Sequence, residues 1–450
     1  MMRRDILILI AVASVILLFN LGGGSLSSWD EAFYAEVSRE ILETNNWIDL
    51  TWGGSPWSDK PPLYMWVTAV FYKMFGVNEF SARLFSALSG TGIVILTYLF
   101  AARLFSRRAG TVSAVMLLST YHFLWLSRMG TLDVTFTFFL LLSVYSFLRS
   151  EINPVNIVYS FIWFGFAFLT KGPAALLIPM ILGLYVLLGR QWRMVLNRYT
   201  AFGVLAFLLI TGSWYVAAFL HYGRSFLEGH FLQHLIGRTT RTMDGHYGNW
   251  LTYFNVVLYK GKPWGFLGLV SFPFLVFYTV KMRHARNYLV ISWVLVVFLV
   301  FCLVRTKLHW YITPVYPAVM VTAGWGMTRL FKRRALVITV VISLLSIIYF
   351  GAKKDVFALD YNPAIKNFAS AVRDVSSEDK GVYLYNISDP AMLFYFGGFS
   401  KNIRSEAELS EAADRKGAVI VASPEELEGL EGRGRIVPAV RADFAAIKIK

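Results

Sequence analysis

The chain has 450 residues, of which 56% are hydrophobic and only 16% are charged, and its mean hydropathy is +0.53. This composition excludes a water-soluble globular protein of the same length and indicates an integral membrane protein. The formal net charge of +15 does not indicate nucleic-acid binding, because most basic residues stand in short segments between apolar runs. Membrane topology and anionic lipids explain these residues better.

The N-terminus reads MMRRD, followed by the apolar run ILILIAVASVILLFNL. A basic flank before an apolar run is also the pattern of a cleaved signal peptide. The many later apolar runs make an uncleaved first membrane helix the simpler explanation. Arg3 and Arg4 then predict a cytoplasmic N-terminus.

Further apolar runs have the length of membrane-crossing helices, which is roughly 17–25 residues. They lie near residues 80–103, 110–128, 134–148, 156–170, 174–189, 200–220, 264–280, 287–304, 311–330 and 335–350. With the first helix, they predict about eleven spans. Every even-numbered connection carries arginine or lysine, and the only acid in these connections is Glu151, which places them in the cytoplasm.

The same topology predicts a transmembrane domain over residues 1–350, with outer loops at residues 23–79 and 221–263. From residue 351 the composition is that of a soluble domain. The segments VYLYN and GAVIVAS have the pattern of buried strands, amphipathic helices surround them, and RIVPAV and FAAIKIK are candidate closing strands. Residues 351–450 therefore have the size and pattern of a small extracytoplasmic α/β domain.

The first outer loop contains WDEAFYAEVSREIL, with Asp30 and Glu31 at its start. The helical spacing of Phe33, Val37 and Ile41 predicts a short helix along the membrane interface. Carboxylates in a first helical turn contribute roughly 0.3–1 kcal/mol to helix stability, which is one explanation for them. The other is catalysis, because a carboxylate beside the bilayer can act as general base toward an incoming hydroxyl.

The same loop ends with WSDKPPLYMW, in which Pro61 and Pro62 fix the chain before the next helix. Asp59 and Lys60 are therefore held at a defined position where the backbone meets the membrane. Lys60 suits a phosphate as a compact point charge. An ion pair with Asp59, or snorkelling to the interface, is the alternative explanation.

Three further turns place charged side chains at the predicted outer face. In SRMGTLDVTF, Asp133 is flanked by apolar sequence and is a candidate functional acid, with an ion pair to Arg128 as the alternative. In TKGP and RTKLHWYITP, Lys171 and Lys307 stand at outer helix ends, where a lysine can meet an anionic head group. Tyr311 can donate a hydrogen bond beside Lys307.

In the second outer loop, His230 and His234 stand four residues apart, on one face of a predicted helix. Two such histidines can share a divalent metal ion, but the sequence shows neither an HExxH pattern nor a third ligand in register. Metal binding and an ordinary interfacial position are both open for them.

Taken in order, the motifs of this chain resemble one group of membrane enzymes. They are WDEAFYAEVSREI, WSDKPPLYMW, GVNEFSARLFSALSG, SRMGTLDVTFTFF, FAFLTKGPAALLIP, WYVAAF and TKLHWYITPVYPA, all within residues 1–330. The set is similar to the GT-C-type membrane glycosyltransferases that use polyprenyl-phosphate sugars. Its strongest similarity is to the transferases of aminoarabinose to lipid A and to the wider group related to protein O-mannosyltransferases.

The resemblance implies a mainly α-helical membrane protein with a GT-C-type bundle, an extracytoplasmic interfacial loop and a small C-terminal α/β domain. It implies a plasma (inner) membrane location and an active site at the outer face. It also implies a lipid-linked sugar donor, inversion at the anomeric carbon, and an acceptor that is a glycolipid such as lipid A, a glycan or a protein.

Matching motifs also imply roles for individual residues. Asp30 is the implied base or acceptor-orienting carboxylate, with Glu31 as its companion and Asp133 as the second acid. The implied contacts to the donor phosphate are Lys60, Lys307 and Tyr311, and Arg128 is a further candidate beside Asp133. The chemistry is consistent with these roles, because a departing polyprenyl phosphate builds negative charge that needs cations and a hydroxyl nucleophile needs a base.

Two positions depart from the family pattern. Phe33 stands where the aminoarabinose enzymes usually have arginine, so one expected phosphate contact is missing. Asp59 replaces the common glutamate before Lys60, and its shorter side chain reaches less far toward any metal shared with His230 or His234.

We therefore expect an inverting glycosyltransferase that needs no cofactor other than a possible divalent metal ion. A transporter or flippase for polyprenyl lipids or solutes is the main alternative, but such proteins often place polar groups near mid-membrane. Here the acids collect at one face. A non-catalytic scaffold that binds lipid phosphate is the third possibility.

Overall fold

The computed structural model describes residues 2–227, 248–353, 356–376, 381–398, 400–430, 432, 434–437 and 444–449. Contacts divide the chain into two compact units. The first, here called the membrane unit, contains Met1–Asn20, Ser58–Tyr64 and Arg83–Phe357. The second, the mixed unit, contains Leu21–Trp57, Met65–Ala82 and Ala358–Lys450. This division does not coincide with the predicted boundary at residue 350, because most of the first outer loop packs with the C-terminal residues.

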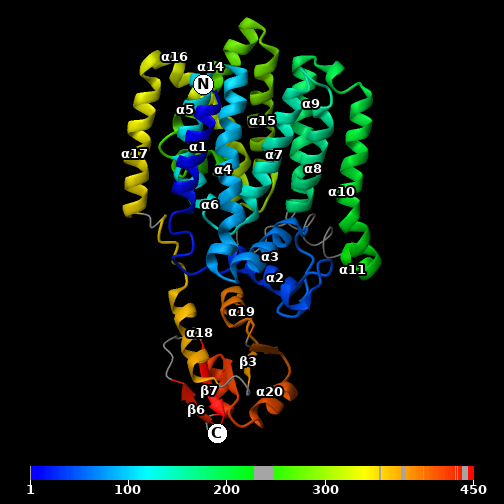
Figure 1. The fold of residues 1–450 in the computed structure, drawn as a ribbon, viewed down its shortest axis with the longest axis vertical. Helices are drawn as coiled ribbons and strands as arrows, with labels where there is room; N and C mark the ends of the chain where they lie inside the picture. The colour runs from blue at the N-terminus through cyan, green and yellow to red at the C-terminus, as the bar shows by residue number, and fades with distance from the viewer. Residues whose placement is uncertain are drawn as a thin grey trace. The chain divides into compact units, whose positions relative to one another are not determined.

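The membrane unit is a bundle of long apolar helices, in which α8 lies between α7 and α10, and α16 packs against α5 and α14 (Figure 1). Its helices are α1 (Met2–Leu18), α4 (Glu79–Leu104), α5 (Arg107–Leu118), α6 (Tyr121–Ser127), α7 (Leu132–Arg149), α8 (Asn156–Lys171), α9 (Leu177–Gly189), α10 (Arg198–Tyr222), α11 (Arg224–Leu227), α13 (Thr252–Tyr259), α14 (Gly265–Met282), α15 (Tyr288–Leu303), α16 (Tyr316–Phe331) and α17 (Ala335–Lys353). Short 3₁₀ helices join several of them: η1 (Gly172–Leu176), η2 (Trp192–Met194), η4 (Ala285–Asn287), η5 (His309–Val315) and η6 (Lys332–Arg334).

In the described part of the chain, seven helical segments are long and apolar enough to cross a membrane. The number is eight if α5 and α6, bent by 69° from each other, form one broken span. The sequence predicted about eleven spans. The numbers differ because the segments Asn156–Gly189 and His309–Lys353 each contain two predicted spans, and α1 has only 17 residues. Each predicted range still coincides with a helix or with the α5–α6 pair, and the mainly helical membrane class is confirmed.

Glycines allow helices of the bundle to approach closely. A Cβ atom on Gly324 of α16 would collide with the Ser113 side chain of α5. A Cβ atom on Gly268 of α14 would likewise collide with Val319 of α16. Lipid chains are as apolar as leucine, so membrane helices gain much of their association from such close backbone contact. These two contacts fix α16 between α5 and α14.

The mixed unit combines a five-stranded sheet with helices and a small hairpin. Its helices are α2 (Asp30–Thr44), all but the first two residues of α3 (Leu63–Phe75), α18 (Pro363–Val375), α19 (Pro390–Phe396), α20 (Glu406–Ala413), α21 (Pro424–Leu427) and the 3₁₀ helix η7 (Glu428–Leu430). Its strands are β1 (Thr51–Trp52), β2 (Ser55–Pro56), β3 (Val382–Tyr385), β4 (Ser400–Ile403), β5 (Val419–Ala422), β6 (Gly434–Val437) and β7 (Ala445–Ile449). The sheet order is β4-β3-β5-β7-β6, with β3 parallel to β4 and β5, and β7 antiparallel to β5 and β6. The predicted α/β character of the C-terminal residues is confirmed.

Helix α2 is a packed element of the mixed unit, since ten of its 15 residues are buried. Ala32 and Ala35 contribute to the same hydrophobic cluster as α18, α19 and strands β3 and β5. On the same helix, Arg39 Nε donates to Glu36 at 2.9 Å, and Arg39 also pairs with Glu43. Burial raises the pKa of Glu36, and the hydrogen bonds and charge of Arg39 oppose that rise. A helix that only lies along the membrane interface buries one face, as the sequence predicted for this segment. Helix α2 buries more of its surface than that.

Arg128 holds the C-terminal end of α1 in the membrane unit. Its side chain is fully buried, and its guanidinium carbon lies 4.9 Å from the centre of the Phe357 ring. Its N–H groups donate at 2.6–3.0 Å to the backbone carbonyls of Ile16, Leu17, Phe19 and Val356. Carbonyls at a helix end have no partner within the helix, so the guanidinium satisfies groups that need donors. This geometry does not support the predicted phosphate contact, because the guanidinium is enclosed by protein and directed at the backbone.

We expect Arg128→Leu to lower the free energy of unfolding by about 3 kcal/mol or more, because buried carbonyls would lose charged donors. Arg128→Lys should recover only part of this loss, since an ammonium cannot reproduce the planar fork of donors. Thermal unfolding of the detergent-purified protein measures both effects.

Arg149→Leu is the matched control, because Arg149 is an exposed arginine on α7. Equal melting temperatures for Arg128→Leu, Arg149→Leu and the unmodified protein would show that Arg128 has no such structural role.

Candidate functional site

A buried ion pair between α7 and α8 forms the centre of the candidate site. Asp133, in the first turn of α7, is 2% exposed, and its Oδ1 accepts a hydrogen bond from Nζ of Lys171, the last residue of α8. The Lys171 Nζ lies 4.9 Å from the centre of the Tyr311 ring in η5 and 5.9 Å from that of Phe136 in α7. The pair therefore joins α7, α8 and η5 at one end of the helical bundle.

The sequence left Arg128 as the alternative partner of Asp133, and the structure gives that place to Lys171. The sequence indicates Lys171 only as one of two lysines at outer helix ends. Gly172 follows it with a φ of 58°, a conformation that favours glycine and that ends α8 after Lys171. The motif TKGP therefore contained the signal for the helix end, but nothing in it identified an acid 38 residues earlier as the partner.

Lys307 caps the C-terminal end of α15. Its Nζ donates to the carbonyls of Phe301 and Cys302, both at 2.7 Å, and lies 5.3 Å from the centre of the Tyr253 ring. An ammonium has three N–H groups, so these two bonds leave one for a further acceptor. Lys307 is 9% exposed, and burial lowers its pKa.

A cavity of about 490 Å³ opens beside Lys307. It is lined by residues 248–250, residues 302–305 and Lys307. Among these, Arg305 and Lys307 are cationic, and Trp250, Leu303 and Val304 are apolar. Cations beside an apolar wall are suited to a phosphate attached to a hydrocarbon chain.

Tyr253, on α13, connects this cavity with the ion pair. Burial raises the pKa of Tyr253, and the nearby Tyr311 and, more weakly, Asp133 raise it further. The Phe301 ring has its centre 6.0 Å from those of both Tyr253 and Tyr311. Asp133, Tyr311, Tyr253 and Lys307 therefore belong to one continuous cluster in the membrane unit.

Lys60 lies in the same unit, on the short segment Ser58–Tyr64. The Tyr64 hydroxyl is 3.2 Å from the Ser86 hydroxyl, which donates at 2.7 Å to the carbonyl of Thr131. Thr131 immediately precedes α7, so this chain of hydrogen bonds ties the Lys60 segment to the start of the helix that carries Asp133. The Lys60 Nζ donates to the preceding backbone carbonyl at 3.3 Å. Its phosphate contact stays a prediction.

Asp30 and Glu31 occupy the first turn of α2 in the mixed unit. Glu31 is 1% exposed, and its Oε2 accepts the backbone N–H of Ser27 at 2.8 Å. It therefore fixes the chain that leads into the helix, which is a structural role. Asp30 is partly exposed and is the first residue of the helix. The catalytic roles of both acids stay predictions.

Phe33, which departs from the family pattern, packs within the mixed unit. Its ring stacks on Trp52 of the β1–β2 hairpin, with centres 4.3 Å apart and planes 15° apart, and lies 5.8 Å from the centre of the Trp57 ring. Stacked aromatic rings add roughly 0.5–1.5 kcal/mol beyond burial of their area. In this chain the position therefore holds the hairpin against α2.

Within the residues that the structure describes, no group of three or more His, Cys, Asp or Glu side chains is arranged to hold a metal ion. His230 and His234 lie outside these residues. A metal site that combines either of them with Asp59 stays a prediction.

Comparison with known proteins adds family relationships to this geometry. The sequence profile of the family described as dolichyl-phosphate-mannose-protein mannosyltransferase matches residues 59–216. An uncharacterised protein of Aquifex aeolicus is 30% identical over 400 residues, which cover 88% of each chain. The undecaprenyl phosphate-alpha-4-amino-4-deoxy-L-arabinose arabinosyl transferase of Edwardsiella ictaluri is 28% identical over 308 residues. That match covers 66% of this chain but only 54% of the transferase.

The fold itself has a solved counterpart. The crystal structure of ArnT from Cupriavidus metallidurans bound to undecaprenyl phosphate superposes with a TM-score of 0.82 and covers 98% of this chain and 97% of that one. The two sequences are 22% identical, so this likeness shows the shared fold. Together with the sequence relatives and the ordered motifs, it shows that the chain belongs to the GT-C-type family of membrane glycosyltransferases.

Proposed function

We propose that this protein is an inverting glycosyltransferase that moves a sugar from a polyprenyl-phosphate carrier to an extracytoplasmic acceptor. The observation that carries the proposal is the Asp133–Lys171–Tyr311 cluster, continuous with the cationic cavity at Lys307, in a fold shared with ArnT. The proposal places the protein in the plasma (inner) membrane, with the N-terminus in the cytoplasm and the site and C-terminal residues outside.

The donor phosphate would bind in the cavity beside Lys307. Bond breaking between the anomeric carbon and the phosphate oxygen leaves the electron pair on the phosphate, so negative charge develops there. The remaining N–H of Lys307 and the guanidinium of Arg305 line that cavity and can stabilise this charge. Trp250 and Leu303 provide apolar surface for the first part of the carrier chain.

The acceptor hydroxyl would attack the anomeric carbon from the side opposite the phosphate, which inverts the configuration. Its proton needs an acceptor, and the proposal assigns this role to Asp30, the partly exposed first residue of α2. Asp133 has a different role, because Lys171 already occupies its Oδ1. Its Oδ2 can accept a hydrogen bond from a hydroxyl of the sugar or acceptor and so orient it.

The relatives indicate which substrates to test first. Undecaprenyl phosphate, the lipid bound in the ArnT structure and named in the arabinosyl transferases, is the first carrier to test. Lipid A, other envelope glycans and proteins are the acceptors to compare. Aminoarabinose is the first sugar to test. Other sugars belong in the same assay, because Phe33 packs on Trp52 at the position where the aminoarabinose enzymes usually have arginine.

We expect Asp30→Asn and Asp133→Asn each to lower the rate of sugar transfer by about 100-fold or more, because the first removes the proposed base and the second removes the carboxylate proposed to orient a substrate hydroxyl. The assay uses proteoliposomes with a labelled undecaprenyl-phosphate sugar and envelope extract, and mass spectrometry identifies the glycosylated product. Asp374→Asn is the matched control, since Asp374 is an exposed aspartate in the mixed unit. A folded Asp30→Asn protein that transfers sugar at the unmodified rate would refute the assignment of the base.

The affinity for undecaprenyl phosphate should depend on pH through Lys307. Burial lowers the pKa of Lys307, and a bound phosphate favours the protonated lysine. Above about pH 7, where the phosphate monoester has lost its second proton, the affinity is expected to be constant up to this lowered pKa. It should fall as the pH rises through it, before an exposed lysine at about 10.4 would titrate. Dissociation constants measured between about pH 7 and pH 10 give this profile.

Lys307→Arg should retain binding and remove the fall, because arginine keeps its charge throughout this range. Lys281→Arg, an exposed lysine at the other end of the unit, should leave the profile unchanged. An identical fall in all three proteins would show that Lys307 does not contact the phosphate.

A further inference from the structure

A larger cavity, of about 960 Å³, lies at the opposite end of the membrane unit from the candidate site. Asp133 stands in the first turn of α7, whereas Glu151, which lines the cavity, follows the last residue of that helix. At 1.5 Å per residue, the 18-residue helix separates its two ends by about 27 Å. The cavity is therefore distinct from the site proposed for sugar transfer.

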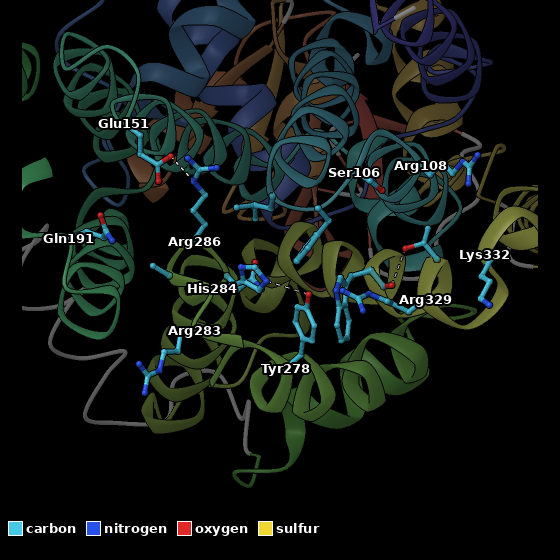
Figure 2. A pocket seen from close by; sticks show the side chains of 16 residues that line it. Ser106, Arg108, Glu151, Gln191, Tyr278, Arg283, His284, Arg286, Arg329 and Lys332 are labelled. Atoms are coloured by element: carbon cyan, nitrogen blue, oxygen red, sulfur yellow. Dashed lines mark hydrogen bonds and ion pairs between the residues drawn. The ribbon is translucent and has the colours of Figure 1, made fainter. Parts of the chain in front are cut away.

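Cations dominate the charged residues of this cavity (Figure 2). The permanently charged cations are Arg108, Arg283, Arg286, Arg329 and Lys332, and the one acid is Glu151. Arg108 lies in the first turn of α5, Glu151 follows α7, and Arg283 and Arg286 lie between α14 and α15. Arg329 is in the last turn of α16, and Lys332 begins η6. Residues far apart in sequence thus converge on one strongly basic space.

Two of these cations are held in place by neighbours. Arg286 Nε lies 2.8 Å from Glu151, and Figure 2 shows this ion pair at one side of the cavity. The Arg329 guanidinium carbon lies 4.4 Å from the centre of the Tyr278 ring and 5.6 Å from that of Trp325. A stacked arginine keeps its charge and its outward N–H donors. The acid therefore balances only part of the positive charge.

The other three cations are arranged around the space. Among the residues that the structure describes, no carboxylate lies within ion-pair distance of Arg108, Arg283 or Lys332. Figure 2 shows Arg283 at one side of the cavity and Arg108 and Lys332 at the other. A phosphate group in this space can therefore meet cations from several elements.

The position of the cavity, at the ends of the membrane-crossing helices, favours a membrane lipid over a soluble anion. Its cationic residues stand at the ends of apolar helices that can cross the membrane, which is the level of the phospholipid head groups. On α14, just before the lining residue Tyr278, Phe274 and Phe277 are 63% and 66% exposed. These side chains offer apolar surface to acyl chains whose head group occupies the cavity.

We infer that this cavity binds the head group of an anionic glycerophospholipid, with its phosphates between Arg283 and the Arg108–Lys332 side. Basic pockets between membrane helices bind lipids of this class. The general excess of cations on one membrane face explains the presence of arginine and lysine there. It does not require a cavity of about 960 Å³ lined by five such cations and one acid, which is the observation that carries this inference.

Native mass spectrometry of the full-length protein in detergent tests this site, with diphosphatidylglycerol as the probe. The variant Arg108→Gln, Arg283→Gln, Lys332→Gln should weaken binding of the probe about 100-fold, since each cation near a lipid phosphate contributes about fivefold. Phosphatidylethanolamine should bind the unmodified protein much more weakly than diphosphatidylglycerol. The experiment measures lipid binding and not sugar transfer. Its result therefore tests this inference independently of the proposed reaction.

The matched control is Arg193→Gln, Arg198→Gln, Arg333→Gln, which removes the same charge from exposed positions outside the cavity lining. It should bind the lipid as the unmodified protein does. Equal losses in both triple variants would show diffuse surface attraction and overturn the inference. Equal binding of phosphatidylethanolamine, or full displacement of the lipid by equimolar inorganic phosphate, would also overturn it. Unchanged melting temperatures confirm that both variants are folded.

Discussion

The candidate site depends on the ion pair between Asp133 and Lys171. Each charge lies in an apolar bundle, where a single unpaired ion would cost several kcal/mol, so neither side chain can leave without exposing the other. The pair therefore fixes the start of α7 against the end of α8. The Lys171 ammonium lies over Tyr311, which extends the same constraint to η5. Phe301 lies against both Tyr311 and Tyr253, and its carbonyl accepts a hydrogen bond from Lys307, so the neighbouring cluster adjoins this frame through α15.

Buried cations in this protein differ in how many of their N–H groups already donate to protein acceptors. This difference separates structural from functional candidates. Arg128 directs its guanidinium at four backbone carbonyls, and Arg39 lies between two glutamates. Both are committed to holding their units together. Lys307 donates to two carbonyls and lines a cavity, so it is fixed in position and still has an N–H for a ligand. A fixed but incompletely used cation is the arrangement that stabilises developing charge without reorganisation.

The helices were largely predictable from the sequence, whereas the partners of charged residues were not. Apolar runs predicted each membrane helix, because length and hydropathy are local properties. Asp133 could be recognised as a candidate from its apolar flanks, but its partner lies 38 residues away on another helix. The acceptors of Arg128 are carbonyls more than 100 residues distant, and a carbonyl has no sequence signature. The packing of α2 with the C-terminal sheet was missed for a similar reason, since Ala32 and Ala35 are as apolar as any interfacial residue.

Phe33 shows how one substitution constrains the source of charge in the proposed site. Its ring is stacked on Trp52, so this position of α2 supports the hairpin and has no charge to offer a phosphate. In the proposed reaction the leaving phosphate still needs cations. Within the membrane unit, Lys307 and Arg305 line a cavity and Lys60 is tied to the start of α7. The proposal therefore assigns the phosphate to these cations and gives position 33 a packing role alone.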